Sequence, residues 1–261
     1  MAMAAEAEVS MAHDGMAPGE WAARVDLAAA YRLVALYGWD DLIFTHLSAR
    51  VPGPEHHFLI NCYDLMFEEI TASNLVKIDA DGQPVGPSAG RRVNPAGFTI
   101  HSAIHMARED AHAVMHLHTP HGQAVSAMAW GLLPHTQTAM IAAHDVAYHE
   151  YEGIATDLDE RARLVEDLGA KNAMILRNHG TLTVGDSVGA CFLRLYFLER
   201  ACEAQVHMLA AGRENLHTPP QGVEAKVADQ SAPKGMGMLA ERLAWPALLR
   251  KLDRIDPSYR T

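Results

Sequence analysis

The sequence predicts an α/β fold of one domain, in which a mixed sheet is flanked by helices. Three observations predict this class. Segments with helical periodicity alternate along the 261 residues with short apolar segments typical of strands. Several of these strand segments follow one another too closely for helical crossovers, so a purely parallel sheet is not expected. Hydrophobic residues make up 49% and charged residues 20% of the chain, which is a globular composition with material for a sizeable core.

The first half of the chain begins with a segment that is not expected to fold. Residues 1–19 are small, polar and rich in Ala and Met, and they predict a disordered leader. A helix is expected from Trp21, where apolar residues begin to recur at three- and four-residue steps, and Gly38 ends it. Turn signals such as Val51-Pro52-Gly53-Pro54 then separate short apolar segments. The next expected elements are strands over 43–51, 58–61 and 75–78, a helix over 97–108, a strand over 113–118 and a helix over 121–130.

The second half of the chain continues the alternation. Mixed strand signals run from Pro134 to about residue 150. Pro219-Pro220 predicts the start of an irregular tail. The other expected elements are a helix over 157–168, a strand over 173–177, a turn at Asn178-His179-Gly180, a strand over 181–184, a long helix over 186–211 and a final helix over 236–252. The organisation predicted is a domain over residues 20–215 followed by a C-terminal extension over 216–261.

Composition excludes several classes of protein. Lys and Arg total 21 against 32 Asp and Glu, so the formal net charge of -11 argues against general binding to a nucleic-acid backbone. The three cysteines are an odd number without C-x-x-C spacing, so neither a disulfide framework nor a thiolate zinc site is indicated. No apolar run reaches the roughly 18 residues of a membrane helix. Because the first 20 residues contain no Lys or Arg, a secretory or transit peptide is not indicated, and we expect a cytoplasmic enzyme or binding protein.

Three of the 16 histidines form a pattern typical of a metal site. His116 and His118 end an apolar strand, and residues two apart on a strand point to one face. His179 follows another apolar strand, where Gly180 permits a sharp turn. Three imidazole ligands, with the fourth coordination position left to water or substrate, are typical of a catalytic zinc site. On spacing alone, histidines with ordinary hydrogen-bond partners at a sheet edge remain the alternative.

A second histidine pair lies on a predicted helix. His101 and His105 are one helical turn apart, but the glutamate of the metalloprotease helix is missing after the first histidine. We therefore expect this helix face to line or support the site rather than to bind a separate metal.

Several stretches together resemble the class II aldolase/adducin family, also called fuculose-phosphate aldolase-like, over about residues 20–215. The stretches are Thr45-His46-Leu47-Ser48-Ala49-Arg50, Glu69-Ile70-Thr71-Ala72-Ser73-Asn74-Leu75-Val76, Ala113-Val114-Met115-His116-Leu117-His118, Leu176-Arg177-Asn178-His179-Gly180 and Leu198-Glu199-Arg200-Ala201-Cys202. The resemblance implies one α/β/α domain with a mainly antiparallel sheet. It also implies one divalent metal, usually Zn²⁺ with Mn²⁺ or Fe²⁺ as alternatives, held by residues that match His116, His118 and His179. A homotetramer with the site near a subunit interface is implied as well.

The sequence departs from the sugar-phosphate aldolases of this family at two places. Those enzymes carry a glutamate at the position of Gly97, four residues before His101. Their phosphate-binding pairs of small residues match Thr45-His46, Tyr63-Asp64 and Pro95-Ala96, which are bulky, acidic or poor in donors. We therefore expect a small-molecule substrate that is not a sugar phosphate. The residues expected to contact the substrate are His46, Asp64 and Arg92.

The resemblance implies a metal-dependent lyase that breaks a carbon–carbon bond and leaves an enediolate, which the cation stabilises. A decarboxylase using the same site is an alternative, because loss of carbon dioxide needs no base and so avoids the step that Gly97 cannot perform. A non-haem Fe(II) oxygenase and an adducin-like binding protein without turnover are further alternatives. Tyr148, His149 and Glu68 are the candidates for proton transfer.

Overall fold

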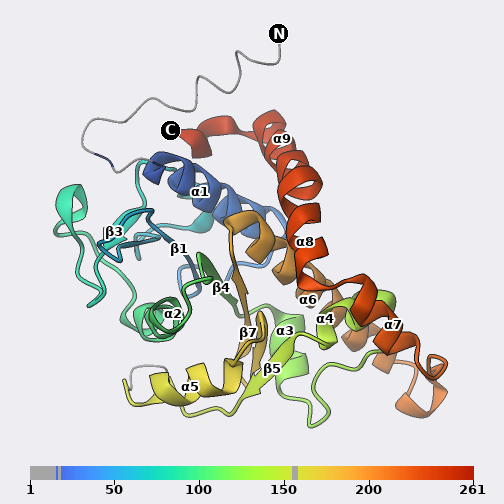
Figure 1. The fold of residues 1–261 in the computed structure, drawn as a ribbon. Helices are drawn as coiled ribbons and strands as arrows, with labels where there is room; N and C mark the ends of the chain where they lie inside the picture. Colours follow the sequence, from blue (N-terminus) through green and yellow to red (C-terminus); the bar gives the residue numbers. More distant parts are fainter. Residues whose placement is uncertain (1–15, 17–18, 155–157) are drawn as a thin grey trace.

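The computed structural model describes residue 16 and residues 19–154 and 158–261. Within these residues the centre of the molecule is a seven-stranded sheet with the strand order β3-β2-β1-β4-β7-β6-β5 (Figure 1). Its strands are β1 (His46–Arg50), β2 (Phe58–Ile60), β3 (Val76–Ile78), β4 (Ala113–Leu117), β5 (Val146–His149), β6 (Ala173–Leu176) and β7 (Gly180–Gly185). β5 and β6 pair in parallel and the other neighbours pair antiparallel. The predicted mixed, mainly antiparallel sheet is confirmed.

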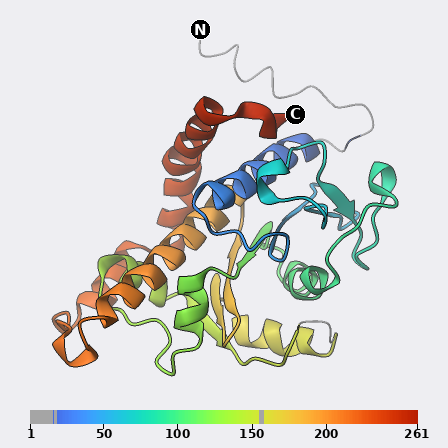
Figure 2. The ribbon, with the colours of Figure 1, turned by 180° about the vertical axis from the view of Figure 1, so that it is seen from behind.

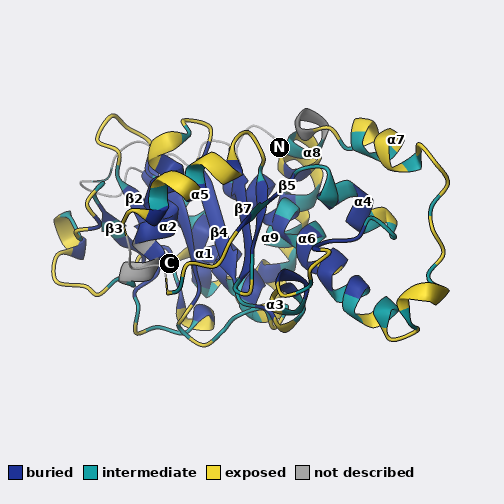
Figure 3. Ribbon diagram, turned by 90° about the horizontal axis from the view of Figure 1, so that it is seen from below, coloured by how far each residue is buried: buried dark blue, intermediate teal, exposed yellow. Residues whose placement is uncertain are grey.

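Helices cover both faces of this sheet (Figure 2). They are α1 (Glu20–Leu36), α2 (Pro95–Ala107), α3 (Pro120–Ser126), α4 (Gln137–Ala143), α5 (Glu160–Leu168), α6 (Val188–Leu209), α7 (Val223–Gln230), α8 (Pro233–Leu239) and α9 (Trp245–Ile255). One apolar core joins the sheet to α1, α6 and α9, and a second joins it to α2 and α5. The strands between these layers are buried (Figure 3), so the predicted α/β/α arrangement is confirmed.

The alternation of side chains along the strands decides what each face contains. In β4, Met115 packs with α1 and α6, whereas Val114 packs with α2 and α5. His116 follows in the same alternation and therefore lies on the α2 side. In β1, His46 lies opposite His116 in the antiparallel register, and Ser48 lies opposite Val114. The sheet thus collects polar side chains of two strands on the face that α2 covers.

The structure differs from the sequence prediction in two segments. The prediction of strands between Pro134 and residue 150 is wrong for the first half of that segment, where the chain forms α4. The second half contains one strand, β5. Thr136 caps α4 by accepting a hydrogen bond from the Ala139 N–H at 3.1 Å. The irregular tail expected after Pro219-Pro220 contains α7, and the final helix is divided into α8 and α9.

The leader predicted over residues 1–19 lies almost entirely outside the described residues. Within the described part of the chain, no helix combines the length and the apolar character that crossing a bilayer requires.

Candidate metal centre

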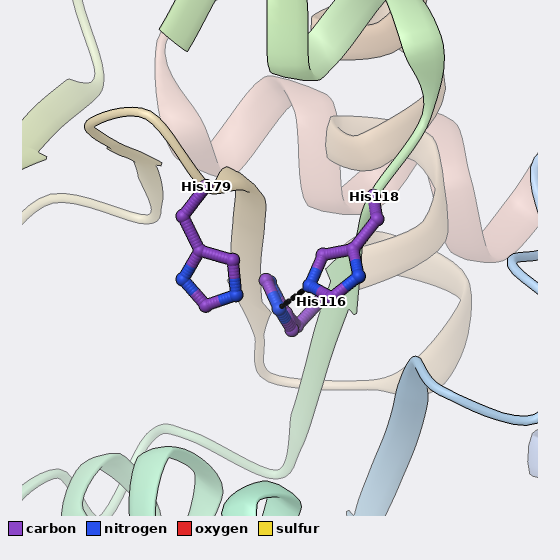
Figure 4. A group of neighbouring side chains, drawn as sticks. All are labelled: His116, His118 and His179. Carbon is purple, nitrogen blue, oxygen red and sulfur yellow. Dashed lines mark hydrogen bonds between the residues drawn. The ribbon is translucent and has the colours of Figure 1, made fainter. Parts of the chain in front are cut away.

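The structure brings the three histidines of the predicted metal site together (Figure 4). His116 lies on β4, His118 directly follows that strand, and His179 lies in the turn between β6 and β7. One ring nitrogen from each residue lies within 4.8 Å of the others. The turn depends on Gly180, because a Cβ there would collide with the carbonyl oxygen of Leu117. Two strand ends thus present three imidazoles to one point, as the spacing predicted.

The hydrogen bonds of His116 and His118 fix which ring nitrogens are free. The Nδ1 of His116 lies 2.9 Å from the carbonyl oxygen of Thr181, which can only accept, so Nδ1 carries the hydrogen. The Nδ1 of His118 lies 3.1 Å from the Asp41 carboxylate and donates in the same way. In the neutral rings each Nε2 therefore offers a lone pair. These two Nε2 atoms face each other at 2.9 Å, an arrangement that is repulsive unless a cation or a proton lies between them.

Burial keeps the imidazoles of His116 and His179 neutral. Desolvation lowers the pKa of His116 well below its ordinary value, and the neighbouring histidines lower it further. Desolvation, with His118 and His149 nearby, lowers the pKa of His179 to about 4. A metal ligand must be a neutral imidazole, so the protonation state at neutral pH suits ligation. Three such nitrogens beside an open cavity are the donor set of a catalytic zinc site, and the residues present fit a divalent cation.

A cavity of about 430 Å³ opens beside the three histidines. The other residues that line it are Asp41, Phe44, His46, Tyr63, Asn94, Ile100, Tyr151, Gly153 and Ile154. Among these described residues there is no Lys or Arg, and the polar groups are one carboxylate, two phenols, an amide and imidazoles. Phe44, Tyr151 and Ile154 are themselves exposed, so apolar surface surrounds the mouth of the cavity.

His46 is a buried imidazole whose two ring nitrogens have no hydrogen-bond partner in the described structure. It is 3% exposed, and its ring centroid lies 5.7 Å from that of His116. Desolvation, with His118 and His179 nearby, lowers its pKa to about 3, so the ring is neutral and offers one donor and one acceptor. Gly97 of α2 lies directly against it, since a Cβ there would come within 2.8 Å of the ring.

A buried chain of hydrogen bonds lies behind His46. The Nδ1 of His105 donates to the Ala111 carbonyl at 2.7 Å, which leaves its Nε2 as an acceptor for the Ser48 hydroxyl at 2.7 Å. Ser48 in turn accepts from the Nδ1 of His101 at 2.6 Å. The Nε2 of His101 is therefore an acceptor, and its ring centroid lies 4.3 Å from that of His46. His101 and His105 support the site, as expected from the sequence.

The candidates for proton transfer do not line the cavity. The Tyr148 hydroxyl accepts a hydrogen bond from the Leu132 N–H at 3.0 Å. The Nδ1 and Nε2 of His149 lie 2.7 Å from a carboxylate oxygen of Asp167 and 3.3 Å from one of Glu160. Glu68 lines a separate cleft formed by α1 and α9 residues. None of these three side chains lines the cavity, although His149 lies near enough to His179 to lower its pKa.

Of the residues expected to contact substrate, only His46 lines the cavity. Asp64 accepts a hydrogen bond from the thiol of Cys62 at 3.0 Å. The carbonyl oxygen of Arg92 accepts a hydrogen bond from the N–H of Tyr63 at 3.0 Å. Asp64 and Arg92 are thus neighbours of Tyr63, which lines the cavity, but they do not line it themselves. The sequence analysis missed Asp41 and Tyr151, which come from loops and carry no spacing signal that could have identified them.

Comparisons with known proteins agree on one family. The family model described as Class II Aldolase and Adducin N-terminal domain matches residues 25–206. A Caulobacter vibrioides protein whose name places it in aldolase class 2 is 59% identical over 240 residues, which are 92% of this chain and 92% of that protein. The crystal structure of an aldolase II superfamily protein from Pseudomonas syringae has a TM-score of 0.88 and 53% identity over 95% of this chain and 98% of that one. An L-fuculose 1-phosphate aldolase from Glaciozyma antarctica has a TM-score of 0.81 and 30% identity over 94% of each chain.

Proposed function

The chain belongs to the class II aldolase and adducin family, and on this premise we propose that it is a divalent-metal-dependent carbon–carbon lyase. Its substrate is a non-phosphorylated hydroxy-carbonyl compound or hydroxy-acid. The observation that carries the proposal is the pair of Nε2 lone pairs of His116 and His118, which face each other at 2.9 Å beside His179. This arrangement favours a bound cation, and three imidazoles favour zinc over harder ions, with Mn²⁺ or Fe²⁺ as alternatives.

A bound divalent cation supplies Lewis-acid stabilisation of the charge that develops on substrate oxygens as the carbon–carbon bond breaks. Thr181 and Asp41 hold His116 and His118 in the orientation that ligation needs. His46 offers an unpartnered donor and acceptor to a substrate oxygen. Asn94 and Tyr151 offer an amide and a phenol to further hydroxyl groups. In this proposal the groups facing substrate are therefore those of His46, Asn94 and Tyr151. They take the place of Tyr148, His149 and Glu68.

The charge of the cavity supports a substrate without a phosphate group. Phosphate is commonly bound by Arg, Lys or exposed backbone N–H groups, and the described lining contains no Lys or Arg. The Glaciozyma antarctica enzyme is named for a sugar phosphate, so the two chains are proposed to differ in substrate charge. A carboxylate of a hydroxy-acid is compatible with the site because it can be bound by the cation.

We further propose a homotetramer whose subunit interface lies near the cavity. The exposed apolar side chains Phe44 and Ile154 at its mouth support this arrangement, because a partner subunit would remove them from water. Light scattering on the purified protein measures the subunit number. The sparse cysteines, which are all free and buried, support a cytoplasmic location.

The test is a substrate screen on protein purified without added metal. Metal analysis identifies the resident ion, and the same protein depleted with a chelator and then reloaded serves as its own control. Hydroxy-ketones, hydroxy-aldehydes and hydroxy-acids are offered, each sugar both free and phosphorylated. Metal-dependent release of an aldehyde from a free compound supports the lyase. Cleavage of phosphorylated compounds alone overturns the substrate assignment.

Other outcomes identify the alternatives. Carbon dioxide release without an aldehyde indicates a decarboxylase, and resident iron with consumption of oxygen indicates an oxygenase. A site that binds no metal, in a folded protein without turnover, indicates an adducin-like binding role, which membership of a family that includes adducins supports.

A further inference from the structure

A buried carboxylate lies behind the metal centre, on the opposite face of the sheet. Glu199 of α6 is 2% exposed and accepts hydrogen bonds from the hydroxyls of Thr119, at 2.5 Å, and Thr181. Within the described residues it has no ion pair, although a buried acid is normally paired with a cation. Desolvation raises its pKa to about 7. Such a costly arrangement of a carboxylate calls for a reason beyond packing.

The two threonines connect Glu199 to the histidines. Thr181 accepts the Nδ1–H of His116 on its carbonyl oxygen while its side chain reaches the carboxylate. Thr119 directly follows His118, and its hydroxyl also accepts the N–H of Gly122 at 2.9 Å, which caps α3. One carboxylate therefore joins the chain that follows His118 to β7, the strand whose Thr181 carbonyl accepts the hydrogen bond from His116.

We propose that Glu199 is a positioning residue of the metal centre, which holds the ends of β4 and β7 at the separation that the three histidines need. This inference rests on the proposed function in one respect, namely that the histidines bind a divalent cation. It assigns Glu199 no contact with substrate or metal. Its influence passes through Thr119 and Thr181.

A carboxylate is required because the two hydroxyls both donate. An ionised Glu199 offers one oxygen to each threonine. A glutamine of the same size has one acceptor oxygen, and its amide group is itself a donor. It can therefore retain one threonine in the present arrangement but not both, so one strand end is released while the volume of the side chain is kept.

The experiment compares Glu199→Gln with the wild type at a pH well above 7, where the carboxylate is ionised. Zinc affinity is measured by competition with a chelator. The absorption spectrum of the Co²⁺-loaded protein reports the geometry of the ligands. Glu199→Gln should bind zinc about 10–100-fold more weakly, as for other groups that orient metal ligands, and should change the Co²⁺ spectrum. Thr119→Val and Thr181→Val, which each release one strand end, should change both measurements in the same direction.

The matched control is Glu20→Gln. Glu20 is an equally buried acid, 1% exposed, but it lies on α1 and is paired with Arg24 and Lys77 at 2.9 Å each. Its replacement should lower stability and leave zinc affinity and the Co²⁺ spectrum unchanged.

The outcomes separate this inference from the proposed function. If the wild type binds no divalent cation, the metal centre itself is refuted and the inference falls with it. If the wild type binds zinc and Glu199→Gln binds it equally tightly with the same Co²⁺ spectrum, the positioning role alone is refuted. Should Glu199→Gln be too unstable to purify, the two threonine variants decide the question by the same measurements.

Discussion

Replacing Gly97 with alanine adds one methyl group between α2 and His46. The new Cβ would lie 2.8 Å from Cδ2 and Nε2 of the ring and 2.9 Å from Cε1. Carbon atoms in nonbonded contact lie about 3.5–4.0 Å apart, so the ring must retreat by roughly 0.7 Å or more. The ring of His101, with its centroid 4.3 Å away, limits that movement. We therefore expect Gly97→Ala to displace His46 within the cavity wall.

The stability change follows from two opposing terms. Alanine is favoured over glycine inside a helix by about 1 kcal/mol, whereas overpacking a buried site costs about 1–3 kcal/mol. Gly237 of α8 provides the matched control, because the nearest atom to its added Cβ, a carboxylate oxygen of Asp186, lies at 3.8 Å. The free energy of unfolding in urea should therefore be about 1–3 kcal/mol lower for Gly97→Ala than for Gly237→Ala.

A second measurement connects the clash to the cavity. Acetohydroxamate is a small bidentate chelator that binds zinc through its carbonyl oxygen and the adjacent deprotonated N–O oxygen, so it mimics the oxygen pair of the proposed substrate class. Its binding to the zinc-loaded protein should weaken in Gly97→Ala, while the zinc content stays that of the wild type because His46 is not among the proposed ligands. If Gly97→Ala is as stable as Gly237→Ala and binds acetohydroxamate normally, the contact between Gly97 and His46 has been misread.

Three further predictions concern the metal centre and its support. His116→Ala should lower zinc from about one ion per chain to almost none while the circular dichroism of the fold is kept, and full zinc occupancy would contradict the ligand assignment. Asp41→Asn removes the charge that faces the Nδ1 of His118 and should weaken zinc binding about 10–100-fold in chelator competition; an unchanged affinity would show that His118 is oriented by other groups. Burial raises the pKa of Glu199 from 4.5 to about 7, so its contribution to stability is full below pH 4.5 and is lost as the pH rises towards 7. The unfolding free energy of the metal-free wild type relative to Glu199→Gln should accordingly fall by on the order of 3 kcal/mol across that range, and a difference that does not vary with pH would contradict the raised pKa.

The convergence of the three candidate ligands could be predicted because it follows local rules, whereas their role as ligands was implied by the family resemblance. His116 and His118 share a face since side chains alternate along a strand, and Gly180 marks the turn that presents His179. The strands were also predictable from local sequence. A short apolar segment bounded by turn signals is too short for a typical helix and is therefore expected to form a strand.

The proton-transfer candidates were not predictable in the same way. Tyr148 and His149 are neighbours on β5, so their side chains point to opposite faces of the sheet. The sequence does not show which elements pack against each face. Asp41 and Tyr151 reach the cavity from loops, whose paths depend on tertiary packing. α4 was missed because a seven-residue helix is too short for its periodicity to be distinguished from that of a strand.

The register between β1 and β4 has a consequence for biosynthesis. His46 and His116 are partners across the sheet, and Leu182 pairs with His116 on the other side, although these three residues are far apart along the chain. The metal centre therefore cannot assemble in a nascent chain before β7 has been synthesised and the long-range pairing is complete. A pairing shifted by one residue would turn His46 to the α1 side and leave the cavity without it. A divalent cation bound as proposed would therefore stabilise only the correctly paired chain, and it would favour the finished sheet over a shifted pairing.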